Sequence, residues 1–144
     1  MRGVVLALGL VLAAPLAAQV PGDSALAAAG ARARAAWQAR DFPALVAGAP
    51  RLQLQLPGAD PSPAVGQAQA VALLTAYVRG TVELGVEVVS ARQVGPDRGF
   101  VELRRRFRPE GTQEERTELV LIGYRRAGGA GAWRLTELRA TPAD

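Results

Sequence analysis

The first part of this chain alternates hydrophobic and polar positions with a helical period. From Ser24 to Arg40, apolar and small residues recur every three or four positions, which predicts an amphipathic helix. Asp41 and Pro43 then form the typical start of a second, short helix that ends before Gly48. The sequence therefore predicts two helices in tandem before any strand. The inward face of the first helix is expected to consist of Leu26, Ala29, Gly30, Ala33 and Trp37.

The next segments change their period twice. Residues 51–56 alternate strictly between polar residues and leucine, which predicts a strand with its leucines on one face. A Pro-Gly pair ends this strand. Ser62 and Pro63 then predict the cap and the first turn of a third helix, which is expected to run to about Arg79 and to stop at Gly80.

After Gly80 the residues alternate with a period of two, which predicts strands. Turns rich in glycine and proline separate three further strands, expected over residues 100–108, 114–126 and 132–140. In the strand that directly follows Gly80, one face is expected to carry Val82, Leu84, Val86 and Val88, and the other face Thr81, Glu83 and Glu87.

The expected element order is thus helix, helix, strand, helix and four strands in a meander. No internal repeat or linker interrupts residues 24–141. This order predicts a single α+β domain in which helices pack on one face of a strongly curved antiparallel sheet.

The N-terminus has the pattern of a secretory signal peptide. Arg2 precedes an apolar run over residues 4–14, and small residues follow it up to Ala18. The run is shorter than the roughly 20 apolar residues of a membrane-spanning helix. We therefore expect a signal peptide over residues 1–18, cleaved near Ala18-Gln19, and a periplasmic or extracellular protein without a stable membrane anchor.

Composition excludes several kinds of chemistry. The chain has 144 residues, 17 basic residues that are all arginine, 13 acidic residues, and neither histidine nor cysteine. A Cys/His zinc site, a cysteine nucleophile, a Ser-His triad and a disulfide framework are therefore excluded. The formal net charge is only +4, and an exported protein does not normally meet nucleic acid. We expect no metal, no cofactor and no nucleic-acid partner.

Three segments carry a resemblance to a known fold. Residues 31–42 end the first helix in Ala-Arg-Asp-Phe, residues 67–71 open the third helix with Gln-Ala-Gln-Ala-Val, and residues 133–139 form the last strand. With the element order, these segments resemble the nuclear transport factor 2-like superfamily, the cystatin-like cone fold shared with SnoaL-like proteins. Within it, the chain resembles a family of exported bacterial proteins of unknown function. The resemblance covers roughly residues 25–141.

The resemblance implies a bent sheet that wraps the helices and leaves one end open as a pocket or an interaction face. Enzymes of this superfamily commonly use an Asp or His base inside the cone. This chain has no histidine, and its aspartates are expected at caps, in turns or at the chain end, where aspartate is common. We therefore assign no catalytic residue. The aspartates concerned are Asp23, Asp41, Asp60, Asp97 and Asp144.

The most conspicuous charge run is the arginine-rich segment 104–108. Such a patch could bind phosphate, an acidic glycan or a membrane surface. However, glutamates of the next predicted strand would neutralise it across the hairpin. Aligning the two strands places Arg104 opposite Glu118 and Arg108 opposite Glu114, and such pairs contribute roughly 0.2–1 kcal/mol each. We favour this structural role.

Arg105 differs from its neighbours because the alternation places it on the inward face. A buried guanidinium must reach solvent, a carboxylate or a ligand, and Glu137 in the last strand is a candidate partner. Tyr77 and Tyr124 could supply hydroxyl groups at the open end. Arg105, Tyr77, Tyr124 and Glu137 therefore form the candidate ligand-binding set. In the alternative interpretation, Arg105 points to water and both tyrosines belong to the core.

Three functions remain open. The first is an exported cone-fold module that binds an unknown small molecule or envelope protein without catalysis. The second is a small SnoaL-like isomerase, cyclase or hydrolase that uses Glu, Tyr or Arg in the cone, with Glu137 held near a neutral pKa by burial. The third is a homodimer through the sheet face, because residues 119–124 are apolar on both faces of their strand.

Overall fold

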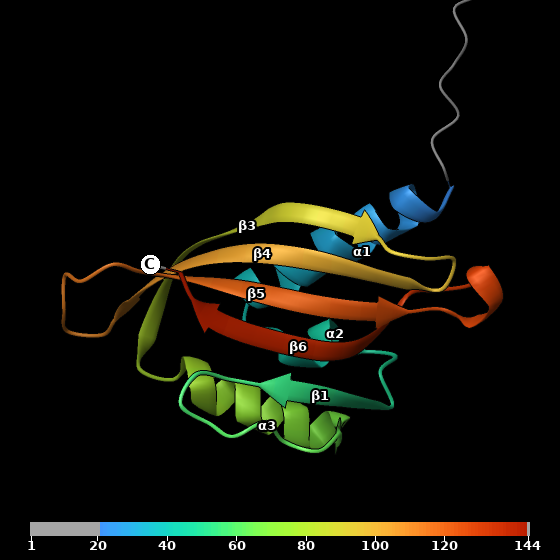
Figure 1. Cartoon of the computed structure of the whole chain (residues 1–144). Helices are drawn as coiled ribbons and strands as arrows, with labels where there is room; N and C mark the ends of the chain where they lie inside the picture. Colours follow the sequence, from blue (N-terminus) through green and yellow to red (C-terminus); the bar gives the residue numbers. More distant parts are fainter. Residues whose placement is uncertain (1–20, 144) are drawn as a thin grey trace, which may run out of the picture.

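The computed structural model describes residues 21–143, so the predicted signal peptide lies outside the described residues. The expected order of helices and strands is confirmed, with one additional short strand, β2. The elements are α1 (Pro21–Gln38), α2 (Phe42–Leu45), β1 (Arg51–Gln55), β2 (Val65–Gly66), α3 (Gln67–Val78), β3 (Thr81–Gln93), β4 (Arg98–Pro109), β5 (Arg116–Arg125), the 3-10 turn η1 (Ala127–Gly129) and β6 (Arg134–Pro142) (Figure 1).

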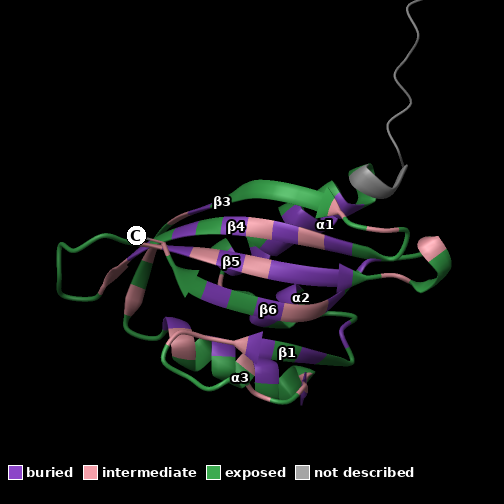
Figure 2. Cartoon of the chain, in the orientation of Figure 1, coloured by how far each residue is buried: buried purple, intermediate pink, exposed green. Residues whose placement is uncertain are grey.

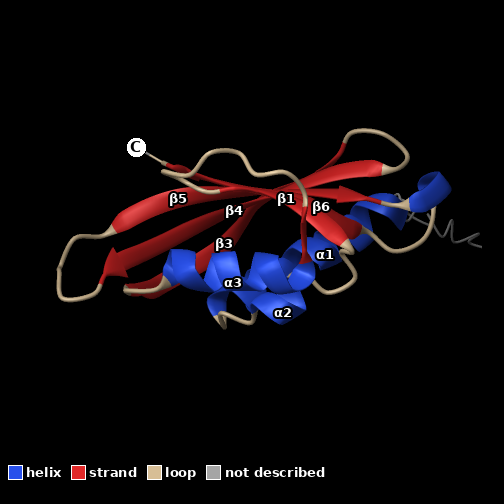
Figure 3. Cartoon of the chain, turned by 90° about the horizontal axis from the view of Figure 1, so that it is seen from below, coloured by secondary structure: helices blue, strands red, loops and turns tan. Residues whose placement is uncertain are grey.

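The strands form one six-stranded sheet in the order β2-β1-β6-β5-β4-β3. Neighbouring strands are antiparallel except β1 and β6, which are parallel, so the sheet is mixed rather than purely antiparallel. All three α-helices lie on the same face of the twisted sheet (Figure 3). This two-layer arrangement confirms the predicted α+β class.

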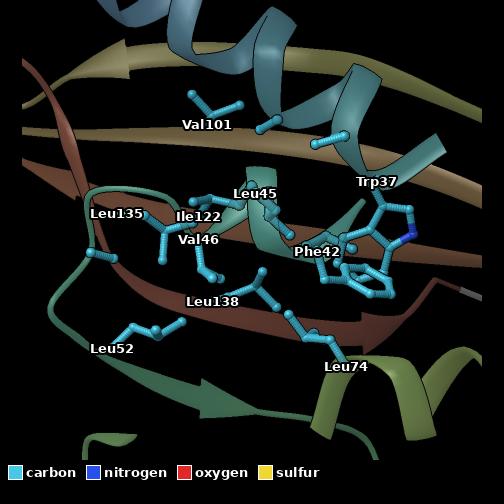
Figure 4. Packing of buried hydrophobic residues seen from close by; sticks show 14 of the residues in the cluster. Trp37, Phe42, Leu45, Val46, Leu52, Leu74, Val101, Ile122, Leu135 and Leu138 are labelled. Carbon is cyan, nitrogen blue, oxygen red and sulfur yellow. The ribbon is translucent and has the colours of Figure 1, made fainter. Parts of the chain in front are cut away.

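The core lies between the helices and the inward side chains of the sheet (Figure 4). Trp37 supplies most of its bulk from α1 and meets Phe42 edge to face, with ring centroids 5.5 Å apart. The predicted inward face of α1 is buried as expected. Gly30 allows this helix to approach the sheet closely, because a Cβ atom there would lie 3.1 Å from Cγ1 of Val101.

The predicted start of the third helix at Pro63 is wrong. β2 pairs with β1, with Val65 opposite Leu52, so the chain stays extended for longer and α3 begins only at Gln67. The Ser62 hydroxyl does not cap the helix but donates to the backbone carbonyl of Leu54 at 3.2 Å. Pairing with the neighbouring strand has therefore overridden the local helix-start signal.

The predicted face of β3 is also wrong, because the strand contains a β-bulge. Glu83 lies opposite Phe107 and Gly85 lies opposite Arg106, so Leu84 has no partner in β4. An extra residue shifts the alternation, and Glu83 therefore faces inward together with the buried Val86. Leu84 is left exposed, as is much of this edge strand (Figure 2).

The predicted register of β4 and β5 is wrong by one residue. Arg105 lies opposite Glu118, and Arg104 lies opposite Leu119. Alternation alone could not choose the register, since β5 is apolar on both faces. The structure buries the face with Val120 and Ile122. The exposed arginines still meet carboxylates, through the ion pairs Arg104–Glu87 at 3.3 Å, Arg106–Glu115 at 2.8 Å and Arg116–Glu114 at 3.1 Å.

Candidate functional site

A cleft of about 620 Å³ opens at the end of the sheet where α3 ends, β4 ends and β5 begins. The chain passes this end again at the C-terminal end of β6 (Figure 1). We call it the cone cleft. Its lining residues are Pro57, Tyr77, Thr81, Arg105, Phe107, Glu114, Glu115, Arg116, Thr117, Glu118, Pro142 and Ala143.

Arg105 is the central charged group of the cone cleft. It is only 1% exposed and lies between two carboxylates. Its Nε donates to Oε1 of Glu83 at 2.7 Å, and its Nη1 donates to Oε1 of Glu118 at 2.7 Å. Nη2 donates to the hydroxyl of Thr81 at 3.1 Å. The desolvated guanidinium is thus matched by opposite charges and fixed by three separate hydrogen bonds.

Aromatic rings complete the surroundings of this guanidinium. Its Cζ lies 4.1 Å from the ring centroid of Phe107, 5.6 Å from that of Trp37 and 5.7 Å from that of Tyr77. Each ring presents an electron-rich face to a cation at such distances. Arg105 therefore joins the polar cleft to the aromatic part of the core.

Tyr77 reaches the same network from α3. Its hydroxyl donates to Oε2 of Glu118, whose other oxygen accepts from Arg105. Burial raises the pKa of Tyr77 far above its ordinary value, and the hydrogen bond to the Glu118 carboxylate raises this pKa further. Tyr77 therefore remains a neutral hydrogen-bond donor throughout the physiological pH range.

Arg40 closes the network from beyond the end of α1. Its Nη2 donates to the backbone carbonyl of Thr81 and lies 3.9 Å from Oε2 of Glu83. The hydroxyl of Thr81 donates in turn to the carbonyl of Val78 at 2.6 Å. Two arginines thus face two buried glutamates, so the inner charges of the cone cleft balance.

The other two predicted site residues lie elsewhere. Tyr124 is buried near the opposite end of β5, where burial raises its pKa to about 12. Glu137 belongs to β6, where it lies opposite Gly123 of β5, and it is only half-buried. The structure therefore brings together Arg105 and Tyr77 of the predicted set, and the acidic partners of Arg105 are Glu83 and Glu118 instead of Glu137.

Sequence reasoning missed both of these glutamates for identifiable reasons. Simple alternation predicts Glu83 on the outer face, because it does not reveal the bulge at Leu84. The predicted register pairs Glu118 with Arg104, one residue away from its observed partner Arg105. One signal in the sequence points to the correct register. An inward-facing Arg105 needs a nearby acidic side chain, because a register that leaves a buried charge unpaired is strongly disfavoured.

Two kinds of feature are absent from the part of the chain that the structure describes. No cluster of three or more Asp, Glu, His or Cys side chains is arranged there to hold a metal ion. None of the described helices is long and apolar enough to cross a membrane.

Comparison with known proteins identifies the fold. No protein-family model matches the chain, and no curated protein matches it either. Among solved structures, it is similar to a ketosteroid isomerase-like protein from Erwinia carotovora atroseptica, with a TM-score of 0.70, 18% identity and coverage of 88% of this chain and 99% of that chain.

Two further solved structures are similar over most of their length. A domain of unknown function with a cystatin-like fold from Nostoc punctiforme has a TM-score of 0.66 and 18% identity, covering 88% of this chain and 80% of that chain. A nuclear transport factor 2-like protein of unknown function from Pseudomonas putida has a TM-score of 0.61 and 18% identity, covering 85% of this chain and 87% of that chain. The chain therefore has the nuclear transport factor 2-like cone fold, as its sequence predicts.

Proposed function

We propose that this nuclear transport factor 2-like cone is an exported binding module that holds a small organic molecule in the cone cleft without transforming it. The observation that carries the proposal is the charge balance around Arg105, at the floor of a cleft of about 620 Å³. A cavity of this size is typical of small-molecule sites.

The same contacts argue against turnover. A general base needs a carboxylate oxygen free to accept a proton from the substrate. In Glu118 one oxygen accepts from Arg105 and the other accepts from Tyr77. Glu137, the acid considered for an enzymatic role, lines other clefts on the sheet. Oε2 of Glu83 has no hydrogen-bond partner, but Glu83 does not line the cone cleft. The described geometry therefore favours recognition over acid-base chemistry.

The cleft also indicates how a ligand would be recognised. Phe107 and the prolines Pro57 and Pro142 supply apolar walls, and Arg105 presents a fixed polar group at the floor. Three hydrogen bonds already hold the guanidinium, so its position does not have to be ordered when a ligand binds. Such preorganisation increases affinity.

Native mass spectrometry of gently purified protein tests the proposal. We expect a reproducible small adduct that is lost on denaturation. Ala143→Trp places a bulky ring at the cone cleft and should abolish the adduct, whereas Ala28→Trp, on the exposed side of α1, should retain it. No adduct, or an adduct that survives Ala143→Trp, contradicts the proposal.

A second candidate function is association of two copies through the outer face of the sheet. The helices cover the other face (Figure 3), and Leu119 and Leu121 remain half-buried on the uncovered one. The same mass spectra report this directly, since a dimer without an adduct would favour association. Leu121→Arg should then shift the mass to that of a monomer.

A further inference from the structure

A second cleft, distinct from the cone cleft, is lined by four arginines. It has a volume of about 360 Å³ and lies where β1 and β6 begin and β5 ends. This is the opposite end of the sheet from the cone cleft (Figure 1). The four residues are Arg51, Arg125, Arg126 and Arg134, and we call this site the arginine cleft.

Unlike Arg104, Arg105 and Arg106, these four arginines form no ion pair within 4.0 Å among the described residues. Among the residues that the structure describes, no carboxylate lines the arginine cleft. Within the described residues, all ion pairs shorter than 4.0 Å involve other arginines. Glu137 lines a neighbouring cleft together with Arg98 and Arg125 but pairs with neither. Within the described residues, no ion pair shorter than 4.0 Å therefore neutralises the four arginines.

The backbone register brings the arginines together. Arg125 lies directly opposite Arg134 in β6 and directly opposite Arg98 in β4. Like charges in directly opposed positions destabilise a sheet. Three arginines in one row across three strands thus oppose one another. Of these, Arg125 and Arg134 line the arginine cleft, and an anion bound there would reduce their repulsion.

Two of the guanidinium groups are held in place by contacts outside the arginine cleft. Nε of Arg126 donates to the carbonyl of Pro96 at 2.8 Å, and its Cζ lies 4.4 Å from the ring centroid of Trp133. Nη2 of Arg51 donates to the carbonyl of Ala64. Each contact uses one N–H group, and the other N–H groups of the guanidinium stay free for a ligand. The arginine cleft is therefore partly preorganised.

Apart from Thr136, the remaining lining residues of the arginine cleft are apolar. Ala127, Ala130 and Ala132 come from the loop after β5, and Leu135 comes from β6. A bare inorganic ion would leave these walls in contact with water. A ligand that fits both features carries an anionic group and a small apolar body.

We propose that the arginine cleft binds a small soluble phosphate monoester whose organic group packs against the alanine and leucine side chains. A phosphate monoester carries a charge of about −1.5 to −2 at pH 7 and three acceptor oxygens, and guanidinium groups match this geometry in bidentate pairs. A carboxylate offers only one charge to four arginines. This site is independent of the function proposed for the cone cleft.

Isothermal titration calorimetry with phenyl phosphate tests the proposal at low ionic strength. One phenyl phosphate should bind per chain, more tightly than inorganic phosphate, and phenol alone should not bind. The double variant Arg125→Gln/Arg134→Gln should weaken binding at least tenfold. The matched control is Arg92→Gln/Arg139→Gln, which removes the same charge from exposed strand positions outside the arginine cleft and should bind as the unmodified chain does.

Three results would overturn the proposal. The first is no heat of binding with phenyl phosphate. The second is an equal loss of affinity in both double variants, which would show that only net charge matters. The third is inorganic phosphate binding as tightly as phenyl phosphate, which would remove the role of the apolar walls. Since the four substituted arginines are exposed, circular dichroism should show both double variants folded.

Discussion

Replacing Arg105 with methionine should destabilise the protein strongly, because the substitution leaves two buried carboxylates without their shared cation. Methionine keeps most of the aliphatic volume of arginine but cannot donate a hydrogen bond. The side chains of Glu83 and Glu118 are only 8% and 7% exposed. Removing one partner of a buried ion pair typically costs about 3–5 kcal/mol.

The contacts of each glutamate refine this expectation. Glu83 retains Arg40, whose Nη2 lies 3.9 Å from Oε2. Glu118 retains only the hydroxyl of Tyr77. The loss of the cation–π contact with Phe107 adds up to about 2 kcal/mol. We therefore expect Arg105→Met to lower the free energy of unfolding by about 4 kcal/mol, a large part of the roughly 5–15 kcal/mol of an ordinary domain.

Urea denaturation followed by circular dichroism measures this change. Arg104→Met is the matched control, because Arg104 is adjacent in the strand but its side chain is 46% exposed and its pair with Glu87 is solvated. The control should change stability by less than about 1 kcal/mol. A loss of less than about 1 kcal/mol in Arg105→Met would refute the reasoning, since the two carboxylates would then not depend on Arg105.

Three further changes test other parts of the structure. Gly99→Ala should lower stability by about 1–3 kcal/mol, because its Cβ would lie 2.7 Å from Cδ2 of the fully buried Leu26. Tyr124, with a pKa of about 12, should show no tyrosinate absorbance at pH 10 while the protein is folded, and stability should fall as pH rises from 10 through 12. Deleting Leu84 should cost much less stability than deleting a residue from a regularly paired part of a strand, because removing the bulge leaves Glu83 opposite Phe107 and still inward.

Each of these changes has a control and a contrary outcome. Gly66→Ala should be mild, as no atom lies within 4 Å of its Cβ; equal effects at Gly66 and Gly99 would contradict the packing argument. Tyr124→Phe should remove part of the loss of stability at alkaline pH. If stability depends on pH in the same way in this variant, the loss does not come from ionisation of Tyr124. Deleting Arg104, which pairs without a register shift with both β3 and β5, should unfold the protein; a tolerated deletion there would refute the contrast with Leu84.

Much of the fold follows from the sequence because its signals are local. The leucine alternation of β1 and the inward face of α1 with Trp37 are both present in the structure. Each signal depends on residues a few positions apart, and a single buried face makes the period unambiguous. The cone fold is therefore predictable from the sequence alone.

The sequence predicts only half of the candidate site, because the other half depends on how β3, β4 and β5 pair. The inward direction of Arg105 follows from alternation within β4, and this residue was identified. Its partner Glu83 depends on a bulge in β3, and Glu118 depends on a one-residue choice between two apolar faces of β5. Neither the bulge nor the register is determined by neighbouring residues alone, so the sequence predicts the buried Arg105 but not its two acidic partners.

The buried network around Arg105 is poorly explained by stability alone. A buried ion-pair triad can often be replaced by apolar residues of similar volume without loss of stability. The triple variant Arg105→Met/Glu83→Leu/Glu118→Leu should therefore recover most of the stability that Arg105→Met loses. If the network exists to present a fixed guanidinium to a ligand, that recovered protein should remain folded and yet lose the adduct of the cone cleft. A triple variant that keeps the adduct would show that the ligand is held by the walls of the cone cleft and not by its charged floor.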